Sequence, residues 1–475
     1  MTSCDPFQRL SFETAAHILH YLDPPTVVCC ERVSKGWRDF IPAWIISSGF
    51  SSNFREQSRV TVADPGQRVP RFKELAAVEA NLSSGKPTTV RKIEARDGLL
   101  VAGNYAVWRT AGDMYWQRLN FTANGTLFPV NKIWCDPPPH RCWSFLLNAD
   151  GYLVVERREL DPRYPNMSID VYSLEENRKL HTLNEPDGLD PRIKGVPVAV
   201  GAQRIYFLLR NAIHAYDLFT GVQLYSTPFT GKSHMVGAGP AVMRDHYSRN
   251  YTTYFPLLND GQRELLPILW NRAIQTINGE DGTLVQEMAV DCWRFPYIAV
   301  ARNQKEFAVV SVRNEPKIAM EMRVQRFSLG SDGLFAESVD PVQHVFLDFP
   351  YTGHNIVAID PFRHLVAIPS LARYIPEISS LVPGDFESVF VPDDPNDTRG
   401  IEPLCRGTVY EITLPPKYAH HKNRRLIVPN DDYSAREMLF VDGDRLLYRT
   451  KHDGARPDTY YIFDFRLRTR GRPRS

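Results

Sequence analysis

The sequence lacks the features of a membrane protein or a general nucleic-acid binder. No apolar run approaches the roughly 20 residues that a membrane-spanning helix needs, and none follows the polar residues 1–5, so we expect neither a membrane span nor a signal peptide. Lys plus Arg number 56 and Asp plus Glu number 55, so no net field draws the chain to nucleic acid or lipid. The cytoplasm, the nucleus or both are the expected locations.

Cysteine is scarce and shows no paired spacing. The seven cysteines are Cys4, Cys29, Cys30, Cys135, Cys142, Cys292 and Cys405. This scatter is typical of free thiols in a reducing compartment. Cys135, His140 and Cys142 lie close together, but three prolines separate them and a fourth ligand is missing, so we expect an ordered Pro-rich loop and no metal.

Catalytic signatures are also missing. There is no Gly-x-Ser-x-Gly, no His-Glu-x-x-His and no glycine-rich phosphate loop. His246 and the pair His420-His421 stand alone, and isolated histidines are more often surface or core residues than catalytic ones. We therefore expect a protein without catalytic activity or a cofactor.

What is present begins with three short helical patterns between Leu10 and Trp44. Ser11 and Ser34 are predicted N-caps of the first and third helices, and Asp23-Pro24-Pro25 is expected to end the first and cap the second. Pro42 is expected to limit the third helix. The predicted apolar faces consist of Ala15, Ile18, Leu19 and Leu22, then Val27, Val28, Cys30 and Val33, then Trp37, Phe40 and Ile41.

Residues 6–45 resemble the F-box in residue type and spacing. The matching features are Leu10, Glu13, Ile18-Leu19, Leu22 with Asp23-Pro24, Val33-Ser34 and Trp37-Arg38. Many positions must agree across three helices, so the resemblance is specific. It implies a domain at residues 1–45 that docks on the Skp adaptor and, through it, on a cullin of a ubiquitin ligase.

By matching position, the resemblance implies seven adaptor-binding residues: Leu10, Ser11, Ile18, Leu19, Leu22, Val33 and Trp37. Ser11 departs from the family, which usually has proline there, and this substitution bears on binding strength. The alternative is that these helices only pack internally. Exposure separates the two, because adaptor docking predicts that Ile18, Leu19 and Val33 are exposed in the free chain.

Residues 46–87 are predicted to be a connector with one helix from about residue 71 to 82. From residue 88 the pattern changes to short Val-, Ile-, Tyr- and Phe-rich runs between turn residues. The clearest unit spans Ile193 to Pro228, where four strands at 196–200, 205–209, 213–217 and 222–226 follow in series. Such a sheet has two apolar faces and therefore needs neighbouring sheets.

Strand pairs like the last two of this unit recur along the chain at irregular intervals. We therefore predict one β-propeller over residues 88–465 with six to eight blades, seven being favoured. A pair of stacked β-sandwiches is the second interpretation. The order of F-box, connector and irregular propeller is similar to that of substrate receptors among fungal F-box proteins. It implies a substrate-receptor subunit, and the alternative is a propeller interaction scaffold without a ligase role.

Three further segments bear on partners. Residues 369–403 form an acidic, Pro-rich insertion, either solvated and flexible or selective for a basic partner segment. Residues 466–475 are a basic tail in which Arg470, Gly471, Arg472 and Pro473 are similar to an AT-hook core. A solvated tail is the main interpretation, and a nuclear-import signal or DNA contact are the alternatives.

The target protein is expected to dock on loops at one end of the propeller, because strands are used up in packing. Two aromatic stretches, 134–143 and 244–254, carry suitable side chains. The predicted target-binding residues are Trp134, Arg141, Trp143, Tyr247, Arg249 and Tyr251. The alternative for the two tryptophans is that they are strand residues packed between blades.

Overall fold

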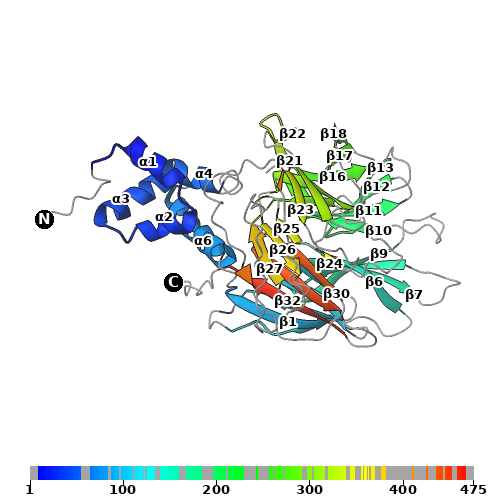
Figure 1. The fold of residues 1–475 in the computed structure, drawn as a ribbon. Coiled ribbons are helices and arrows are strands. Elements are labelled where there is room, and N and C mark those ends of the chain that lie inside the picture. The colour runs from blue at the N-terminus through cyan, green and yellow to red at the C-terminus, as the bar shows by residue number, and fades with distance from the viewer. Residues whose placement is uncertain are drawn as a thin grey trace.

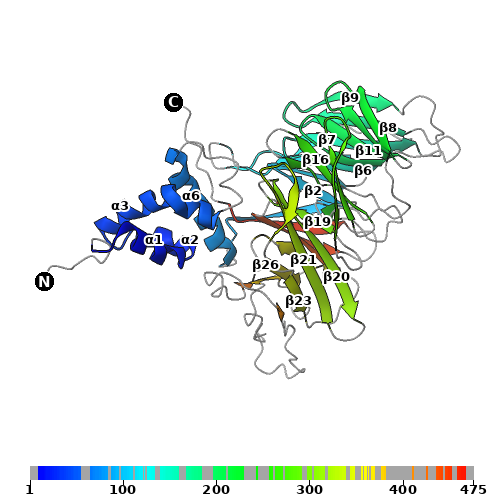
Figure 2. The same ribbon diagram turned by 90° about the horizontal axis from the view of Figure 1, so that it is seen from above.

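A computed structural model shows a helical N-terminal region followed by a large region of β-sheets (Figure 1). It describes residues 9–54, 65–83, 87–133, 140–159, 167–184, 196–228, 242–243, 256–290, 297–347, 355–369, 376–380, 409–410, 424–425, 435–451 and 457–466, with gaps of one to four residues inside several of these ranges. Both ribbon views place the helices at one end of the molecule, outside the sheets (Figures 1 and 2).

The predicted helix caps are confirmed. The backbone N–H groups of Thr14, Thr26 and Trp37 donate to the side chains of Ser11, Asp23 and Ser34, respectively. Each cap satisfies a backbone donor that has no partner within its helix. The helical elements are α1 (Phe12–His20), α2 (Pro24–Cys30), α3 (Lys35–Trp44), η2 (Ile45–Gly49), α4 (Phe50–Asn53) and α6 (Pro65–Ser83).

The prediction that Pro42 limits the third helix is wrong. Helix α3 continues to Trp44 and passes directly into the π-helical η2. An internal proline costs about 3 kcal/mol, but Trp44 and Ile45 are both fully buried beyond it. Burying each large apolar side chain contributes roughly 1.5–3 kcal/mol, which offsets that cost.

The segment predicted as a connector shares a core with the first three helices. Phe50, Phe54 and Phe72 pack in one cluster with Leu19 and Trp44. Helix α6 begins at Pro65, earlier than the predicted start near residue 71, and contains Pro70. Its early start is held by tertiary contacts, because the Arg68 guanidinium donates to the carbonyl of Ile46 over 2.7 Å.

The described strands form seven sheets, a set consistent with a β-propeller. Three of them consist of four consecutive strands each. The first contains β6 (His140–Leu147), β7 (Tyr152–Glu159), β8 (Met167–Ser173) and β9 (Arg178–Asn184). The second contains β10 (Val196–Val200), β11 (Arg204–Leu209), β12 (Ala212–Asp217) and β13 (Gln223–Pro228), and the third contains β15 (Leu258–Asn259), β16 (Glu264–Trp270), β17 (Ala273–Asn278) and β18 (Leu284–Ala289). The four-stranded unit predicted between Ile193 and Pro228 is thereby confirmed.

The other four sheets depart from this plain order, and the predicted blade number stays a prediction. The first contains, in spatial order, β14 (Val242–Met243), β2 (Leu99–Ala102), β3 (Tyr105–Thr110), β4 (Asp113–Arg118) and β5 (Asn131–Ile133). The second contains β19 (Tyr297–Val300), β20 (Glu306–Glu315), β21 (Ala319–Leu329), β23 (Gln343–Leu347) and β28 (Val409–Tyr410), and β22 (Phe335–Glu337) also pairs with β21. The third contains β25 (Ala358–Asp360), β26 (Leu365–Pro369), β27 (Pro376–Ser380) and β29 (Arg424–Arg425), and the fourth contains β1 (Thr89–Ala95), β32 (Asp458–Asp464), β31 (Arg445–Lys451), β30 (Ala435–Val441) and β24 (Asn355–Ile356).

The same tight turn joins the last two strands of three sheets and also joins β21 to β22. Its left-handed position is held by Asn177, Gly221, Gly282 and Gly333, with φ between 50° and 78°. A Cβ atom at Gly221 would overlap Leu183 of the preceding sheet, and one at Gly282 would overlap Tyr225. Each of these two turns therefore packs on the outer strand of the sheet before it. This sequential contact favours a propeller over stacked sandwiches.

The first and last strands meet in one sheet. β1 pairs antiparallel with β32 from Thr89 opposite Asp464 to Ala95 opposite Asp458. Ile93 of β1 and Ile462 of β32 are both buried in the core that also contains Leu99 and Trp108 of the next sheet. Because β1 and β32 hydrogen-bond to each other, neither strand has an unpaired backbone edge on the side that faces the other.

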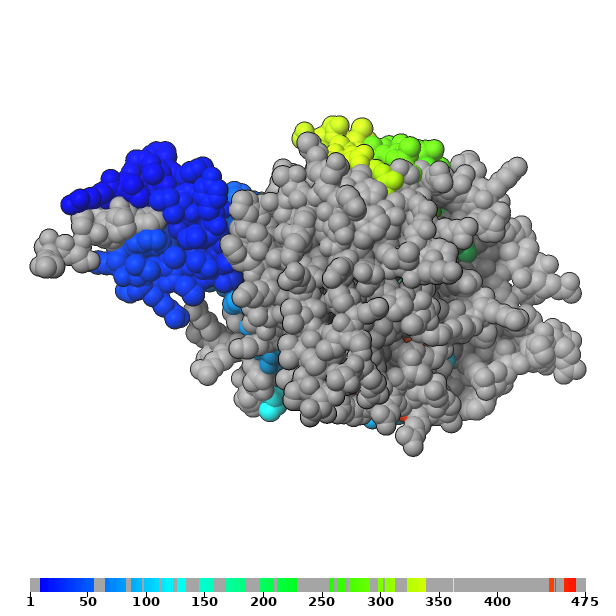
Figure 3. Space-filling model, viewed as in Figure 1, coloured from blue at the N-terminus to red at the C-terminus, as the bar shows by residue number. Residues whose placement is uncertain are grey.

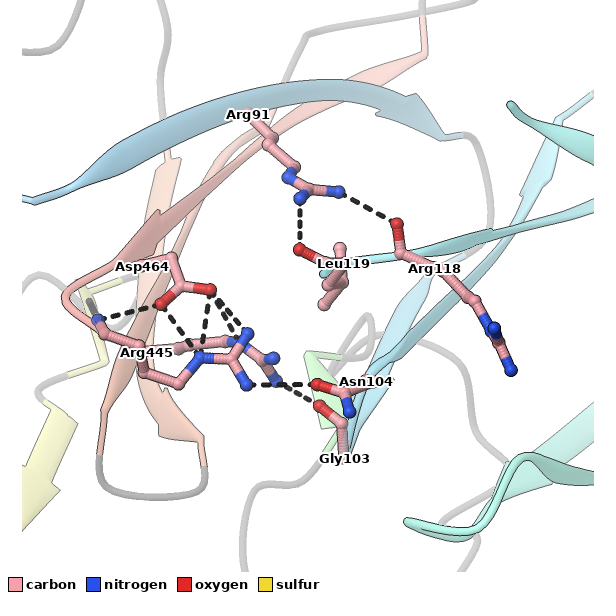
Figure 4. Close-up of polar contacts among 8 residues, drawn as sticks. Arg91, Gly103, Asn104, Arg118, Leu119, Arg445 and Asp464 are labelled. Carbon is pink, nitrogen blue, oxygen red and sulfur yellow. Dashed lines mark hydrogen bonds and ion pairs between the residues drawn. The ribbon is translucent and has the colours of Figure 1, made fainter. Parts of the chain in front are cut away.

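A polar cluster links this closing sheet to the sheet of β2–β5 (Figure 4). The Arg445 guanidinium, fully buried, lies 3.2 Å from Asp464 Oδ2 and also donates to the carbonyl of Gly103. Arg466 donates to Asn104 Oδ1 over 3.1 Å, and Arg91 donates to the carbonyl of Arg118 over 3.1 Å. Burial lowers the pKa of Arg91 to about 10, so it stays charged at neutral pH.

Asp464 makes this cluster sensitive to acid. Burial acts to raise its pKa, but hydrogen bonds and charge from Arg466 and Arg445 outweigh burial and lower the pKa. A lowered folded-state pKa stabilises the fold above the unfolded-state pKa and loses that contribution as pH falls through the folded value. We expect the free energy of unfolding to fall below about pH 4.

The measurement is urea unfolding of the wild type and of Asp464→Asn between pH 3 and 7. The variant should be less stable at pH 7 and show a flatter pH dependence than the wild type. Equal slopes for the two proteins would contradict this role for Asp464.

Two predicted segment boundaries are wrong. Residues 376–380, inside the predicted insertion, form β27, because β26 and β29 pair with it on both sides. Arg466, assigned to the free tail, contacts Asp464 over 2.7 Å and Asn104. Most of the insertion, and Arg470, Gly471, Arg472 and Pro473, lie outside the described residues.

Candidate protein-docking surface

The helical region has its own core. Ala15, Leu19, Val27, Ile41 and Trp44 are buried against one another. Phe72, Leu75 and Ala76 of α6 complete this core. The helices are too short to be stable alone, so this packing is what holds their outer surface in place.

Five large apolar side chains of this region are excluded from the core. They are Leu10, Phe12, Ile18, Tyr21 and Val33, with exposed fractions of 37, 42, 40, 57 and 65%. We call these five the helical docking surface. Exposed apolar patches mark protein-interaction sites, so these five side chains are the candidates that the helical region offers for a partner.

The structure separates the seven predicted adaptor-binding residues into two groups. Leu10, Ile18 and Val33 are exposed, whereas Leu22 and Trp37 are half-buried and pack against the helical core. Ser11 is exposed and caps α1. The prediction that Leu19 is exposed is wrong, since it has no exposed surface.

Leu19 is buried and Ile18 is exposed because the apolar face of α1 is wider than the part of it that the core covers. Leu19 lies one turn after Ala15, and both point into the core against Trp44 and Ile45. Ile18 is rotated by about 100° from Leu19 and therefore falls outside that contact. Phe12 and Tyr21 were missed from the sequence, although α1 carries more apolar residues than one buried face can accept.

Local contacts fix the aromatic members of the surface. The Phe12 and Phe40 rings lie 5.0 Å apart between centroids, so the start of α1 is packed on α3. The Tyr21 hydroxyl lies 3.2 Å from His17 Nε2, one turn earlier in α1. At the first turn, a backbone hydrogen bond, followed by one from Ser11, lowers the pKa of Glu13, which suits the positive helix N-terminus.

Helix α6 joins this surface to the sheets. Near its middle it is tied to the end of α2 by the ion pair of Lys73 with Glu31, the C-cap of α2, at 2.6 Å. Near its end, the Asn81 side chain donates to the carbonyl of Phe465, just beyond β32, over 3.0 Å. One helix therefore contacts both regions and fixes the distance between them.

The predicted target-binding residues are only partly covered by the structure. The loop predicted at 134–143 is wrong for residues 140–143, because Arg141 and Trp143 belong to strand β6. Trp143 sits at a register shift between Cys142 and Ser144, where β6 bulges against β7. The side chains of both, and all of Trp134, Tyr247, Arg249 and Tyr251, lie outside the described residues.

Strand β2 connects the end of the first aromatic stretch with the strand that precedes the second. The stretch 244–254 follows β14, in which Met243 pairs with Leu99 of β2. Strand β2 in turn lies against β6, which carries Arg141 and Trp143. Pairing between segments so far apart in sequence was not predicted.

The described residues also bear on metal ligands and membranes. Across the described residues, His, Cys, Asp and Glu side chains form no group of three or more suited to a metal ion. In that same part of the chain, no helix combines the length and apolarity needed to cross a membrane. Cys29 and Cys30 are free thiols, as predicted.

Comparison with known proteins gives a likeness in fold only. No family model and no curated protein matches the sequence. The β-propeller domain of Myceliophteria thermophila Cps50 (Swd1) is similar over 79% of this chain and 99% of its own, with 12% identity and a TM-score of 0.41. The C-terminal WD40 domain of Sif2 is similar over 79% of this chain and 98% of its own, with 10% identity and a TM-score of 0.34. Kluyveromyces lactis Hsv2p is similar over 78% of this chain and 95% of its own, with 9% identity and a TM-score of 0.34.

Proposed function

We propose that this chain is the substrate receptor of a cullin-based ubiquitin ligase. The helical region docks on the Skp adaptor, and the sheets, taken as one seven-bladed propeller, hold the target protein. The chain itself performs no chemistry and acts by positioning the target. This role places it in the cytoplasm or the nucleus.

The observation that carries the proposal is the exposure of Ile18 and Val33. Both occupy F-box positions that the family uses against the adaptor, and neither is consumed by the chain's own core. A free receptor must present such side chains to solvent until its partner covers them. The contacts of α6 with both regions support the positioning role, since a fixed spacing keeps a bound target near the transfer site.

The second candidate is an interaction scaffold whose helices only pack internally. It is favoured by Leu19, Leu22 and Trp37, which lie in or against the helical core. The two functions differ in what the exposed side chains do. In the scaffold, Ile18 and Val33 have no partner role and their replacement changes nothing.

The test is a binding titration between the purified chain and a purified Skp adaptor. Ile18→Asp with Val33→Asp should weaken binding by at least about thirtyfold, which corresponds to the loss of about 2 kcal/mol from a single hot-spot residue. Both side chains are exposed, so the helices should keep their circular dichroism and melting temperature. Val130→Asp is the matched control, since Val130 is 52% exposed but lies beside β5 in the sheets.

An unchanged dissociation constant in the folded double variant would reject the ligase role and favour the scaffold. Leu19→Ala is a separate comparison, because its cost falls first on helix stability. A cavity in a packed core costs about 2–5 kcal/mol of unfolding free energy.

A further inference from the structure

A second exposed apolar set lies on the sheets. Val222, Leu284 and Leu334 are 60, 56 and 41% exposed. Val222 and Leu284 follow the turn that joins the last two strands of their sheets, and Leu334 follows the turn between β21 and β22. The three sheets succeed one another along the chain. The N–H groups of Asp217 and Gly330 donate to the carbonyls of Val222 and Leu334, so these two residues occupy the same position of the turn. In the second turn that position is held by Thr283, and Leu284 is the next residue.

The three turns are neighbours in space. A Cβ atom at Gly282 would overlap Thr227 and Tyr225 of β13, so the second turn packs on the strand that follows the first. Gly333 of the third turn lies beside Arg263, whose charge also acts on Asp281 of the second. Strands β13, β18 and β22 occupy one edge of the molecule in Figure 1, and Figure 3 shows the green and yellow-green segments of the second and third sheets side by side at the surface.

The same turns are acidic. The segments 217–224, 278–287 and 329–337 contain Asp217, Glu280, Asp281, Glu287, Asp332 and Glu337 and no Lys or Arg of their own. The Arg263 guanidinium beside Gly333 offsets one of these six negative charges. Hydrogen bonds from the Thr283 backbone and hydroxyl lower the pKa of Asp281, so its carboxylate is charged at neutral pH. We call the three segments the acidic–apolar rim.

We propose that the acidic–apolar rim binds a partner protein through a segment in which Lys or Arg alternates with apolar residues. The apolar members would cover Val222, Leu284 and Leu334, and the basic members would meet the turn carboxylates. Charge complementarity decides the class of partner, because an acidic segment would be repelled. This surface is separate from the helical docking surface and does not depend on the ligase role.

The size of the rim sets the length of the segment. Packed sheets lie about 10 Å apart and an extended chain rises about 3.3 Å per residue, so three turns are spanned by roughly six to eight residues. A short linear segment is therefore sufficient.

The test uses the full chain and fluorescein-labelled peptides of roughly eight residues, a length set by that span. The probe alternates Arg with Leu, and the comparison peptides alternate Arg with Ser and Glu with Leu. We expect saturable binding of the Arg-Leu peptide, at least tenfold weaker binding of each comparison peptide, and weakening with salt.

Two variants locate the site. Val222→Ser with Leu284→Ser and Leu334→Ser should weaken the Arg-Leu peptide at least tenfold, and Glu280→Gln should weaken it and reduce the salt dependence. Leu127→Ser is the control, because Leu127 is 45% exposed and lies outside the rim. All these side chains are exposed, so melting temperatures should match the wild type.

Three results would overturn the proposal. The first is an affinity for the Arg-Leu peptide that is the same in the triple variant and the wild type. The second is a loss of affinity in Leu127→Ser as large as that in the triple variant, and the third is binding of the Glu-Leu peptide as tight as that of the Arg-Leu peptide. Self-association of the wild type that the triple variant abolishes would assign the rim to a second copy of this chain instead.

Discussion

Replacing Asp170 by Asn is expected to lower the free energy of unfolding of the sheet region by about 3–5 kcal/mol. Asp170 of β8 is fully buried. Its carboxylate lies 2.6 Å from Arg157 and 2.9 Å from Lys179, and it accepts a 2.7 Å hydrogen bond from the Thr182 hydroxyl. Asn keeps the shape but removes the charge, so Arg157, itself 8% exposed, loses the charge of this partner in a buried site.

The measurement is equilibrium urea unfolding followed by circular dichroism. Asp113→Asn is the matched control, since Asp113 pairs with Lys132 at 2.8 Å on the surface. An exposed pair of this kind contributes about 0–1 kcal/mol. Equal losses in the two variants would show that the Asp170 cluster is not a stabilising centre.

The second large effect is expected from removing β1. A chain beginning at residue 88 keeps β1 and should remain folded and strand-rich, whereas one beginning at residue 97 should be unfolded or aggregate. The longer truncation removes the seven-residue pairing with β32, the buried Ile93 and the contacts of Arg91 with the next sheet. Loss of Ile93 packing alone costs about 2–5 kcal/mol, a large part of the 5–15 kcal/mol of a typical domain.

Both truncated chains lose the helical region, so the comparison isolates β1. Solubility, far-ultraviolet circular dichroism and melting temperature are the readouts. A folded chain beginning at residue 97, as stable as the one beginning at 88, would contradict a closing role for β1. A helix-dominated spectrum of the chain beginning at 88 would contradict the predicted β-rich region.

Local sequence signals predicted the elements well where the signal was itself local. The caps at Ser11, Asp23 and Ser34, and the four strands from Val196 to Pro228, follow from capping side chains and period-two alternation. Both depend on neighbours a few residues away. The recurring turn also has a local sequence signal. Gly221 and Gly333 stand directly before an exposed apolar residue, and Gly282 stands two residues before one.

The candidate surfaces could be predicted less completely. The F-box spacing selected a segment that carries exposed apolar side chains but not the direction of each one, because Leu19 is buried while its neighbour Ile18 is exposed. Burial of Leu19 depends on Trp44 and on α6, which begins more than 40 residues later. No local pattern contains that contact.

What the sequence determined by itself is the division into a helical N-terminal region and a β-rich remainder, together with the F-box resemblance and the turn chemistry. These follow from short-range spacing, which fixes backbone propensity. Only the tertiary structure decided that helices α3 and α6 continue through Pro42 and Pro70, that β1 closes on β32, and that three turns bring Val222, Leu284 and Leu334 to one rim. In each case, burial and pairing between distant segments outweigh the local preference, because their free energy is available only once the chain has folded.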